Sequence, residues 1–228
     1  MPAFAHVSVL RNPDRSKLSK RKNPVWVSDY RAKGFLPEAM KNYMATMAWS
    51  YPGKELFTVD EMIEKFEIKD IQTTAPIFDQ EKLRWMNGEY IRQMNEKELI
   101  AKICAFDATV PKDSDELMKK ILPLVRERMK TLSEFETLAD FFFARPVKFE
   151  HELKKDLLAV ATQALETVSD WKHDVMEQAI RSSAEKAGVK ARDVFMELRI
   201  AITGKSVGPP LLESLEILGK EETLSRLL

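Results

Sequence analysis

A short basic loop near the start of the chain carries side chains that could act in catalysis. The loop consists of Lys17, Leu18, Ser19, Lys20 and Arg21. A lysine offers a compact positive charge and three hydrogen-bond donors. Such a cation stabilises the charge that builds on phosphates in a transition state. The small Ser19 lets the backbone approach a ligand. The loop therefore favours contact with a nucleoside triphosphate, although a solvated basic loop has the same composition.

A metal centre is not expected, because suitable ligands are few and widely spaced. The chain has one cysteine, Cys104, and three histidines that lie far apart, which gives no zinc-ligand spacing. A single cysteine also excludes an internal disulfide and is typical of a reducing, cytoplasmic compartment. Residues 203–206 resemble the end of a phosphate-binding P-loop, but Arg199 stands where that motif requires glycine.

Charge and composition narrow the classes of protein further. The chain has 228 residues, no formal net charge and a pI near 6.9, so any RNA binding must use local patches rather than a whole-molecule field. Hydrophobic residues make up 44% of the chain, and the scarcity of glycine, with seven in all, favours helices over a large sheet. No stretch approaches the roughly 18 apolar residues of a membrane span. The first residues also lack the pattern of a secretory signal.

Helical periodicity dominates the chain after an unusual start. Residues 3–10 are expected to form one β-strand, and the absence of a clear strand after it indicates a sheet that lies upstream. Asn87 and Gly88 are expected to end a helix, and a seam near residues 108–113 is expected to separate two helical parts. One helix is expected to begin at Pro37. Three more are expected to begin directly after the capping residues Thr58, Asp79 and Asn95.

Five segments, in order along the chain, carry a family resemblance. They are Asn-Pro-Asp-Arg-Ser-Lys-Leu-Ser-Lys-Arg-Lys at 12–22, Gly-Phe-Leu-Pro-Glu-Ala at 34–39, Phe-Asp at 78–79 with Lys-Leu-Arg-Trp-Met-Asn-Gly-Glu-Tyr-Ile-Arg at 82–92, Arg-Ile-Ala-Ile-Thr-Gly at 199–204, and Leu-Gly-Lys-Glu at 218–221. Together they resemble the bacterial-type glutamyl-tRNA synthetases, which are class I aminoacyl-tRNA synthetases. Several segments in register are far more specific than any one of them.

This resemblance implies an activity and a domain organisation. The family attaches glutamate to tRNA-Glu through a glutamyl adenylate made from ATP, which enters as substrate with Mg²⁺. Residues 1–23 would be the end of a Rossmann-type catalytic domain, with a remnant strand and the basic loop. Residues 24–110 would be a helical stem-contact domain, and residues 111–228 a two-part helical anticodon-binding domain. The expected fold class is therefore mainly α, with two consecutive helical bundles.

The resemblance also assigns roles to residues of the basic loop. Lys17 and Lys20 would be the catalytic lysines that contact the phosphates, above all Lys20. Leu18, Ser19 and Arg21 would complete the ATP-binding loop. No zinc site is implied for this chain.

Four residues would read the anticodon. By motif position, Arg199, Pro209 and Leu211 match the family's anticodon pocket, and Arg128 matches an arginine that reads the third anticodon base. The chemistry is reasonable, because RNA is read mainly at splayed loops, where guanidinium planes stack on bases or bond to their edges. A solvated helix arginine at 128, and plain turn and core residues at 209 and 211, are the alternatives.

The front of the chain departs from the family. No His-x-Gly-His element that holds ATP is present, and His6 has no glycine near it. Glutamate and ATP would therefore be bound through a missing N-terminal half, and the chain alone is expected to be inactive.

The expected macromolecular partner is tRNA-Glu, and no membrane partner is expected. The protein is expected to be a cytoplasmic monomer. Two alternatives remain, a free-standing tRNA-binding module and a helical interaction scaffold without catalysis. Neither needs the ATP loop at 17–21.

Overall fold

A computed structural model describes residues 4, 7–19, 26–111 and 113–227 of the chain. Within these residues the regular structure is helical and includes no strand, which confirms a mainly α protein. The chain divides into two compact units, residues 1–99 with 128–134, and residues 100–127 with 135–228. The predicted domain boundaries, between residues 23 and 24 and between residues 110 and 111, were drawn by function. The division into compact units does not test them, so they stay predictions.

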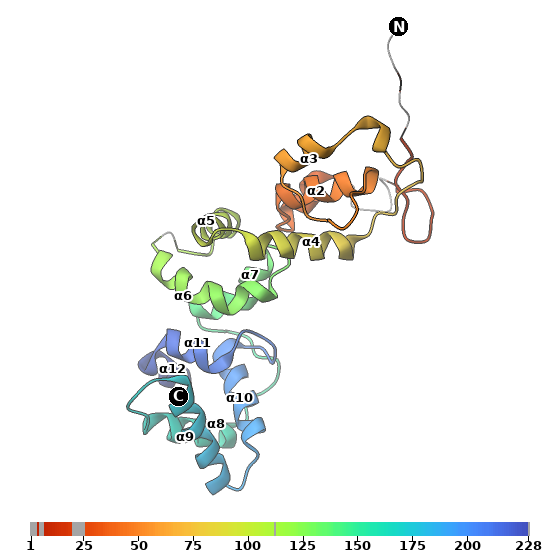
Figure 1. Ribbon diagram of the computed structural model, residues 1–228. Coiled ribbons are helices and arrows are strands. Elements are labelled where there is room, and N and C mark those ends of the chain that lie inside the picture. Colours follow the sequence, from red (N-terminus) through yellow and green to blue (C-terminus); the bar gives the residue numbers. More distant parts are fainter. Residues whose placement is uncertain (1–3, 5–6, 20–25, 112, 228) are drawn as a thin grey trace. The chain divides into compact units, whose positions relative to one another are not determined.

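The first unit contains helices α1 to α4 (Figure 1). Their bounds are α1 Val27–Ala32, α2 Pro37–Ala48, α3 Val59–Lys65, the short 3₁₀ helix η1 Ile68–Asp70 and α4 Gln80–Gln93. Three elements contain residues of both units, namely α5, Glu96–Phe106, the 3₁₀ helix η2, Arg126–Arg128, and α7, Glu134–Ala139, which has only its first residue in the first unit.

Local sequence signals place the helix starts in this unit. Thr58 and Glu61 form a reciprocal capping box at α3. The carboxylate of Asp79 accepts hydrogen bonds from two backbone N–H groups in the first turn of α4. Asn95 Oδ1 accepts from the Lys97 backbone N–H at 3.0 Å, in the first turn of α5. The capping predictions at these three positions are confirmed.

An aromatic cluster forms the core of the first unit. The ring of Phe78 packs edge-on against Tyr43 at 5.5 Å and against Tyr30 at 5.9 Å between ring centroids. The Tyr43 hydroxyl donates to the Asp79 carbonyl at 2.8 Å and accepts from the Asp79 N–H at 2.7 Å. Burial raises the pKa of Tyr43 to about 12, so its hydroxyl stays protonated. The start of α4 is thereby tied to α2.

The predicted helix end at Asn87 and Gly88 is wrong, because α4 continues to Gln93. Asn87 is fully buried, and its side chain links two distant backbone segments. Its Oδ1 accepts from the Leu36 N–H at 2.7 Å, and its Nδ2 donates to the Lys130 carbonyl at 2.6 Å. A Cβ on Gly88 would lie 3.4 Å from the Met129 carbonyl oxygen. Tertiary contacts, rather than helix termination, account for this Asn-Gly pair.

The predicted strand at residues 3–10 is not confirmed. Residues 1–3 and 5–6 lie outside the described part of the chain, and residues 7–10 are not in a strand. Arg11, the next residue, makes isolated bridges to Lys17 and to Ile77. Its N–H donates to the Pro76 carbonyl at 3.0 Å, and its carbonyl accepts from the Phe78 N–H at 2.8 Å. Arg11 therefore pairs with the segment before α4.

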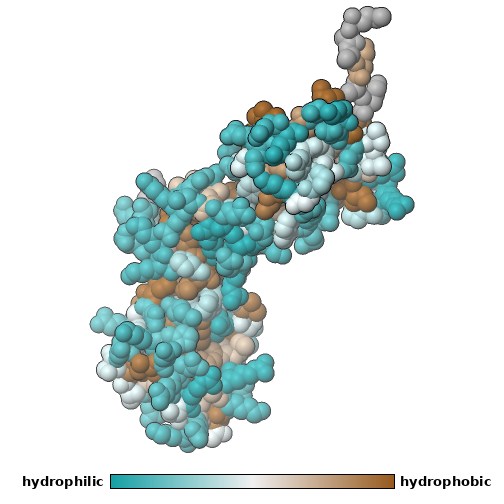
Figure 2. All heavy atoms as spheres, in the orientation of Figure 1, coloured by the Kyte–Doolittle hydropathy of each residue, from teal (hydrophilic) through white to brown (hydrophobic). Residues whose placement is uncertain are grey.

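The second unit is built around α8, which packs against both α9 and α10 (Figure 1). The bounds are α6 Asp115–Val125, α7 Glu134–Ala139, η3 Asp140–Phe142, α8 Lys155–Glu166, α9 His173–Lys186, α10 Ala191–Thr203, α11 Leu211–Leu218 and α12 Lys220–Leu227. Pro123 lies inside α6 without ending it. Hydrophobic residues on the visible face of each unit gather in small patches among hydrophilic ones (Figure 2). None of the described helices is both long and apolar enough to cross a bilayer.

Candidate functional site

The basic loop is entered through a tight hairpin. The N–H of Asn12 donates to the Ser16 carbonyl at 2.8 Å, and the N–H of Leu18 donates to the Leu10 carbonyl at 3.1 Å. Arg15 at the tip has φ 66°, in the left-handed region that few non-glycine residues adopt. The hairpin thus reverses the chain within a few residues and delivers Lys17 next to Arg11.

Short polar side chains brace this hairpin from inside. Asp14 Oδ1 accepts from the Ser16 N–H at 2.9 Å and from the Ser16 hydroxyl at 2.6 Å. Asn12 Nδ2 donates to Ser16 Oγ at 3.0 Å. Asx-type bonds of this kind fix a turn without a regular strand. Sequence reasoning missed this bracing, although the Asn-Pro-Asp run is a turn signal that could have found it.

The hairpin separates the polar and apolar residues of the predicted ATP loop. Lys17 is exposed, whereas Leu18 packs against the aromatic cluster that contains Phe78. Ser19 is half-buried. Lys20 and Arg21, also predicted for this loop, lie outside the described residues. The described part of the loop therefore has an apolar anchor and presents a cationic side chain to solvent.

A cavity of about 260 Å³ lies beside the hairpin and includes Leu18 in its wall. Asp79 and Glu81 also line it, and both carry carboxylates. A phosphate would be repelled by these acids. The side of the loop that suits a phosphate is therefore the exposed side with Lys17, and not this cavity.

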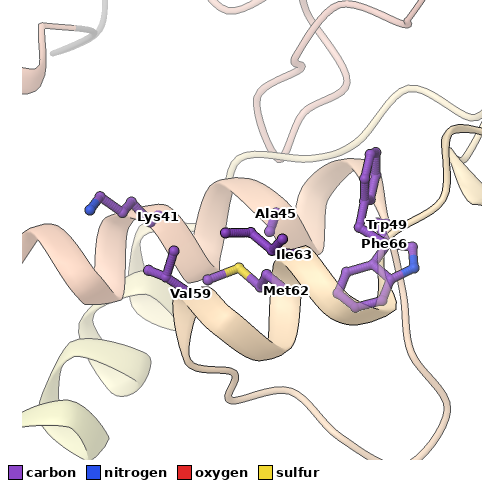
Figure 3. Close-up of a pocket in the computed structure, with 7 residues that line it drawn as sticks. All are labelled: Lys41, Ala45, Trp49, Val59, Met62, Ile63 and Phe66. Atoms are coloured by element: carbon purple, nitrogen blue, oxygen red, sulfur yellow. The ribbon is translucent and has the colours of Figure 1, made fainter.

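The groove between α2 and α3 also does not suit a polar ligand (Figure 3). It measures about 280 Å³, and Lys41 is its one charged lining residue. The other lining residues are Ala45, Trp49, Val59, Met62, Ile63 and Phe66. An apolar wall of this kind offers almost no donors to a phosphate or a base.

In the second unit, two of the four predicted anticodon residues, Arg199 and Pro209, are in contact, and Leu211 follows two residues after Pro209. The Arg199 Nη1 group donates to the Pro209 carbonyl at 2.7 Å. Pro209 is buried, and Leu211, which is 7% exposed, is the first residue of α11. Arg199 itself is half-buried on α10. One end of its guanidinium plane is thus fixed against the turn that leads into α11.

The turn after α10 explains the Thr-Gly pair that follows Arg199 in the motif. Thr203 Oγ1 lies 2.8 Å from the Arg199 carbonyl oxygen and accepts from the Lys205 N–H at 3.2 Å. Gly204 ends α10 with φ 78°, and a Cβ there would lie 2.7 Å from the Lys148 carbonyl oxygen. Only glycine fits both conditions.

The P-loop-like segment at 203–206 serves the same turn. Lys205 Nζ donates to the Thr137 carbonyl and to Asp140 Oδ2, each at 2.8 Å. These bonds hold the lysine against its own unit.

Arg128, the fourth predicted residue, is the last residue of η2 and is exposed. It falls in the first unit, whereas the other three fall in the second, so its joint role with them stays a prediction. The segment after it is firmly held, because the Leu132 N–H donates to the Gly34 carbonyl at 3.0 Å. A Cβ on Gly34 would lie 2.6 Å from the Ser133 nitrogen, so this glycine too permits a close backbone approach.

Among the described residues, no group of three or more His, Cys, Asp or Glu side chains is arranged to hold a metal ion. Cys104 is half-buried, and burial raises the pKa of its thiol. It therefore lacks the thiolate character of a reactive or metal-binding cysteine.

Comparisons with known families give two matches that overlap slightly. Residues 81–228 match the family described as anticodon binding domain. Residues 1–85 match the catalytic domain of class I tRNA synthetases for glutamate and glutamine (E and Q). The second match extends past the predicted boundary at residue 23, and that boundary stays a prediction.

Individual relatives agree with these matches. The chain is 39% identical over 234 residues to glutamate–tRNA ligase 1 of Fervidobacterium nodosum, covering 99% of this chain and 48% of the relative. It is 39% identical over 236 residues to a glutamate–tRNA ligase of Thermus thermophilus, covering 99% of this chain and 50% of the relative.

A solved structure shows the same likeness. A glutamate tRNA ligase from Elizabethkingia meningosepticum, solved in complex with its amino acid, matches with a TM-score of 0.83 and 29% identity. The match covers 100% of this chain and 51% of that one. The chain thus spans about half the length of the relatives it matches. Its sequence and fold place it in the glutamyl-tRNA synthetase family of class I aminoacyl-tRNA synthetases.

Proposed function

We propose that the chain acts as the C-terminal portion of a glutamate–tRNA ligase and supplies the ATP-phosphate loop and the anticodon-reading surface. The observation that carries the proposal is the bond from Arg199 Nη1 to the Pro209 carbonyl. It holds the guanidinium group of the half-buried Arg199 against the turn before α11, where such a plane can stack on a splayed RNA base or bond to its edge.

The reaction of the whole protein has two steps. The glutamate carboxylate attacks the α-phosphate of ATP, which forms glutamyl adenylate and releases pyrophosphate with its Mg²⁺. A terminal hydroxyl of tRNA-Glu then attacks the adenylate carbonyl and releases AMP. In the first step, Lys17 and Lys20 contact the phosphates that gain charge, and Ser19 and Arg21 complete the loop.

The structure of the hairpin supports this role for Lys17. Its backbone is held next to Arg11, and the neighbouring Leu18 is anchored in the aromatic cluster. A lysine on an anchored backbone loses less freedom when it binds a phosphate than one on a free chain. Lys20 would act from the same loop.

Domain roles follow from the same proposal. Residues 1–23 end the catalytic domain, residues 24–110 contact the tRNA stem, and residues 111–228 bind the anticodon. Arg199, Pro209 and Leu211 form one part of the anticodon site, and Arg128 reads the third base. The protein acts in the cytoplasm as a monomer, with tRNA-Glu as its macromolecular partner.

Direct binding of tRNA-Glu to the chain tests the proposal. We expect measurable affinity at low salt and a steep loss as salt rises, because phosphate contacts release counterions. The absence of binding at low salt would contradict the proposal.

A matched pair of variants on α10 locates the site. Arg199→Lys keeps the charge but loses the planar guanidinium, so we expect roughly tenfold weaker binding, equivalent to about 1.4 kcal/mol. Arg192, exposed on the same helix, is the control, and Arg192→Lys is expected to bind like the wild type. Equal loss in both variants would contradict the placement of the site.

A further inference from the structure

Three exposed hydrophobic side chains lie on two segments of the second unit that are far apart in sequence. Val147 is 91% exposed, Phe149 is 41% exposed and Val207 is 76% exposed. Val207 stands two residues before Pro209, whose carbonyl holds Arg199. These three residues, called here the apolar rim, have no role in the functional site described above.

Backbone contacts hold the two segments of the apolar rim together. The Glu150 N–H donates to the Gly204 carbonyl at 3.1 Å. On the other side of Phe149, the Lys148 carbonyl oxygen would lie 2.7 Å from a Cβ at Gly204. Hydrogen bonds from Ser206 lower the pKa of the Glu150 carboxyl. The backbone on both sides of Phe149 is therefore fixed against the turn at residues 204–206.

The same turn leads directly to the arginine site. The Thr203 hydroxyl can donate its one proton to the carbonyl of Arg199 or of Lys205, and its oxygen accepts from the Lys205 N–H, so it ties the end of α10 to the turn after it. The turn ends at Gly208, where a Cβ would lie 3.6 Å from Arg199 Nη1. Phe149 is thus connected to Arg199 through one short, internally bonded turn.

We propose that Phe149 is a stacking platform for an unpaired base of the anticodon loop, next to the base that meets Arg199. The inference rests on the proposed function. A flat aromatic face accepts any base, and the neighbouring cation of Lys148 suits the phosphate that accompanies it. Phe149 would strengthen binding of the anticodon loop whatever the base, while Arg199 would discriminate between bases.

The apolar rim fits a base better than a protein partner. Along residues 147–150, hydrophobic and charged side chains alternate, so no broad apolar face forms. A stable protein interface needs about 800 Å² on each partner, with an apolar centre. One aromatic ring on a fixed backbone beside a cation is instead the arrangement of a single-strand RNA site.

Binding of an RNA hairpin tests the platform with the full chain. The probe is a fluorescently labelled anticodon stem and loop of tRNA-Glu. We expect Phe149→Ala to weaken binding by about 5- to 150-fold, the range that one lost base–aromatic stack produces. The dependence of affinity on salt should keep its slope, because stacking releases few counterions.

Two further variants serve as controls for the effect of Phe149→Ala on RNA binding. Phe149→Trp keeps an aromatic face and should retain affinity, and the tryptophan emission that it adds should fall when the RNA binds. Ile63, 74% exposed in the other unit, supplies the control, and Ile63→Ser should bind like the wild type. Circular dichroism checks that each variant is folded.

The possible failures are distinguishable. If the wild-type chain does not bind the hairpin, the proposed function fails and the platform fails with it. If the wild type binds and Phe149→Ala binds equally well, only the platform is overturned. If Phe149→Ala changes self-association and leaves RNA affinity intact, the apolar rim is a protein interface, and the platform is again overturned.

Discussion

Replacement of the buried Asn87 tests how the first unit is held together. Asn87→Ala removes the acceptor of the Leu36 N–H and the donor to the Lys130 carbonyl, at 2.7 and 2.6 Å. Each buried backbone group left without a partner costs about 1–3 kcal/mol. The lost side-chain volume leaves a cavity as well. The expected loss in the free energy of unfolding is therefore about 2–6 kcal/mol, confined to the first unit.

The four tryptophans allow the two units to be measured separately. Trp26, Trp49 and Trp85 lie in the first unit, and Trp171 lies in the second. In a Trp171→Phe background, tryptophan fluorescence during urea unfolding reports on the first unit alone. This separation is needed because a protein of two units need not unfold in a single step.

The control for Asn87 lies on the same helix. Gln93 is exposed near the end of α4, and Gln93→Ala should change the free energy of unfolding by no more than about 0.5 kcal/mol. A loss below about 1 kcal/mol for Asn87→Ala would refute the role of Asn87 as the link between the two backbone segments.

Three further predictions concern the second unit and the anticodon. Gly204→Ala should destabilise the second unit by at least about 1–2 kcal/mol, because φ is 78° and the Lys148 carbonyl blocks a Cβ; unfolding followed by tryptophan fluorescence measures this. Hydrogen bonds from Arg145 and a second arginine lower the pKa of Glu222 from 4.5 to about 2. The stability that this carboxylate contributes is present above pH 4.5 and lost as pH falls toward 2, so Glu222→Gln should flatten the acid limb of stability against pH. Arg128→Ala should weaken discrimination at the third anticodon base more than total binding, and an equal loss on all anticodon variants would count against its role.

Local chemistry made the helix starts predictable from sequence. Thr58 with Glu61, and Asp79 at α4, bond to backbone groups within a few residues, so their side chains and spacing suffice. The predicted helix end at Asn87 was wrong because asparagine, which often ends a helix, can also bridge buried backbone groups. Its partners, Leu36 and Lys130, are 51 and 43 residues away, and no local pattern reveals them.

The candidate site was predictable in part for the same reason. The resemblance indicated Arg199, Pro209 and Leu211, and the structure bonds Arg199 on α10 to Pro209, two residues before Leu211 at the start of α11. Phe149 gave no signal in the sequence, because its proposed role depends on a backbone contact between residues 150 and 204. The composition of the loop at 17–21 was enough to predict contact with phosphates. The packing of its Leu18 against the aromatic cluster became visible only in the structure.

Whether the chain reads the anticodon can be measured by the dependence of its tRNA binding on the anticodon sequence. The chain would be titrated with tRNA-Glu and with the same tRNA carrying a different anticodon, at one fixed moderate salt concentration. We expect at least about tenfold weaker binding of the altered tRNA, because several base contacts are lost and each removes about 1 kcal/mol or more. Equal affinity for the two RNAs would contradict the claim that this chain reads the anticodon.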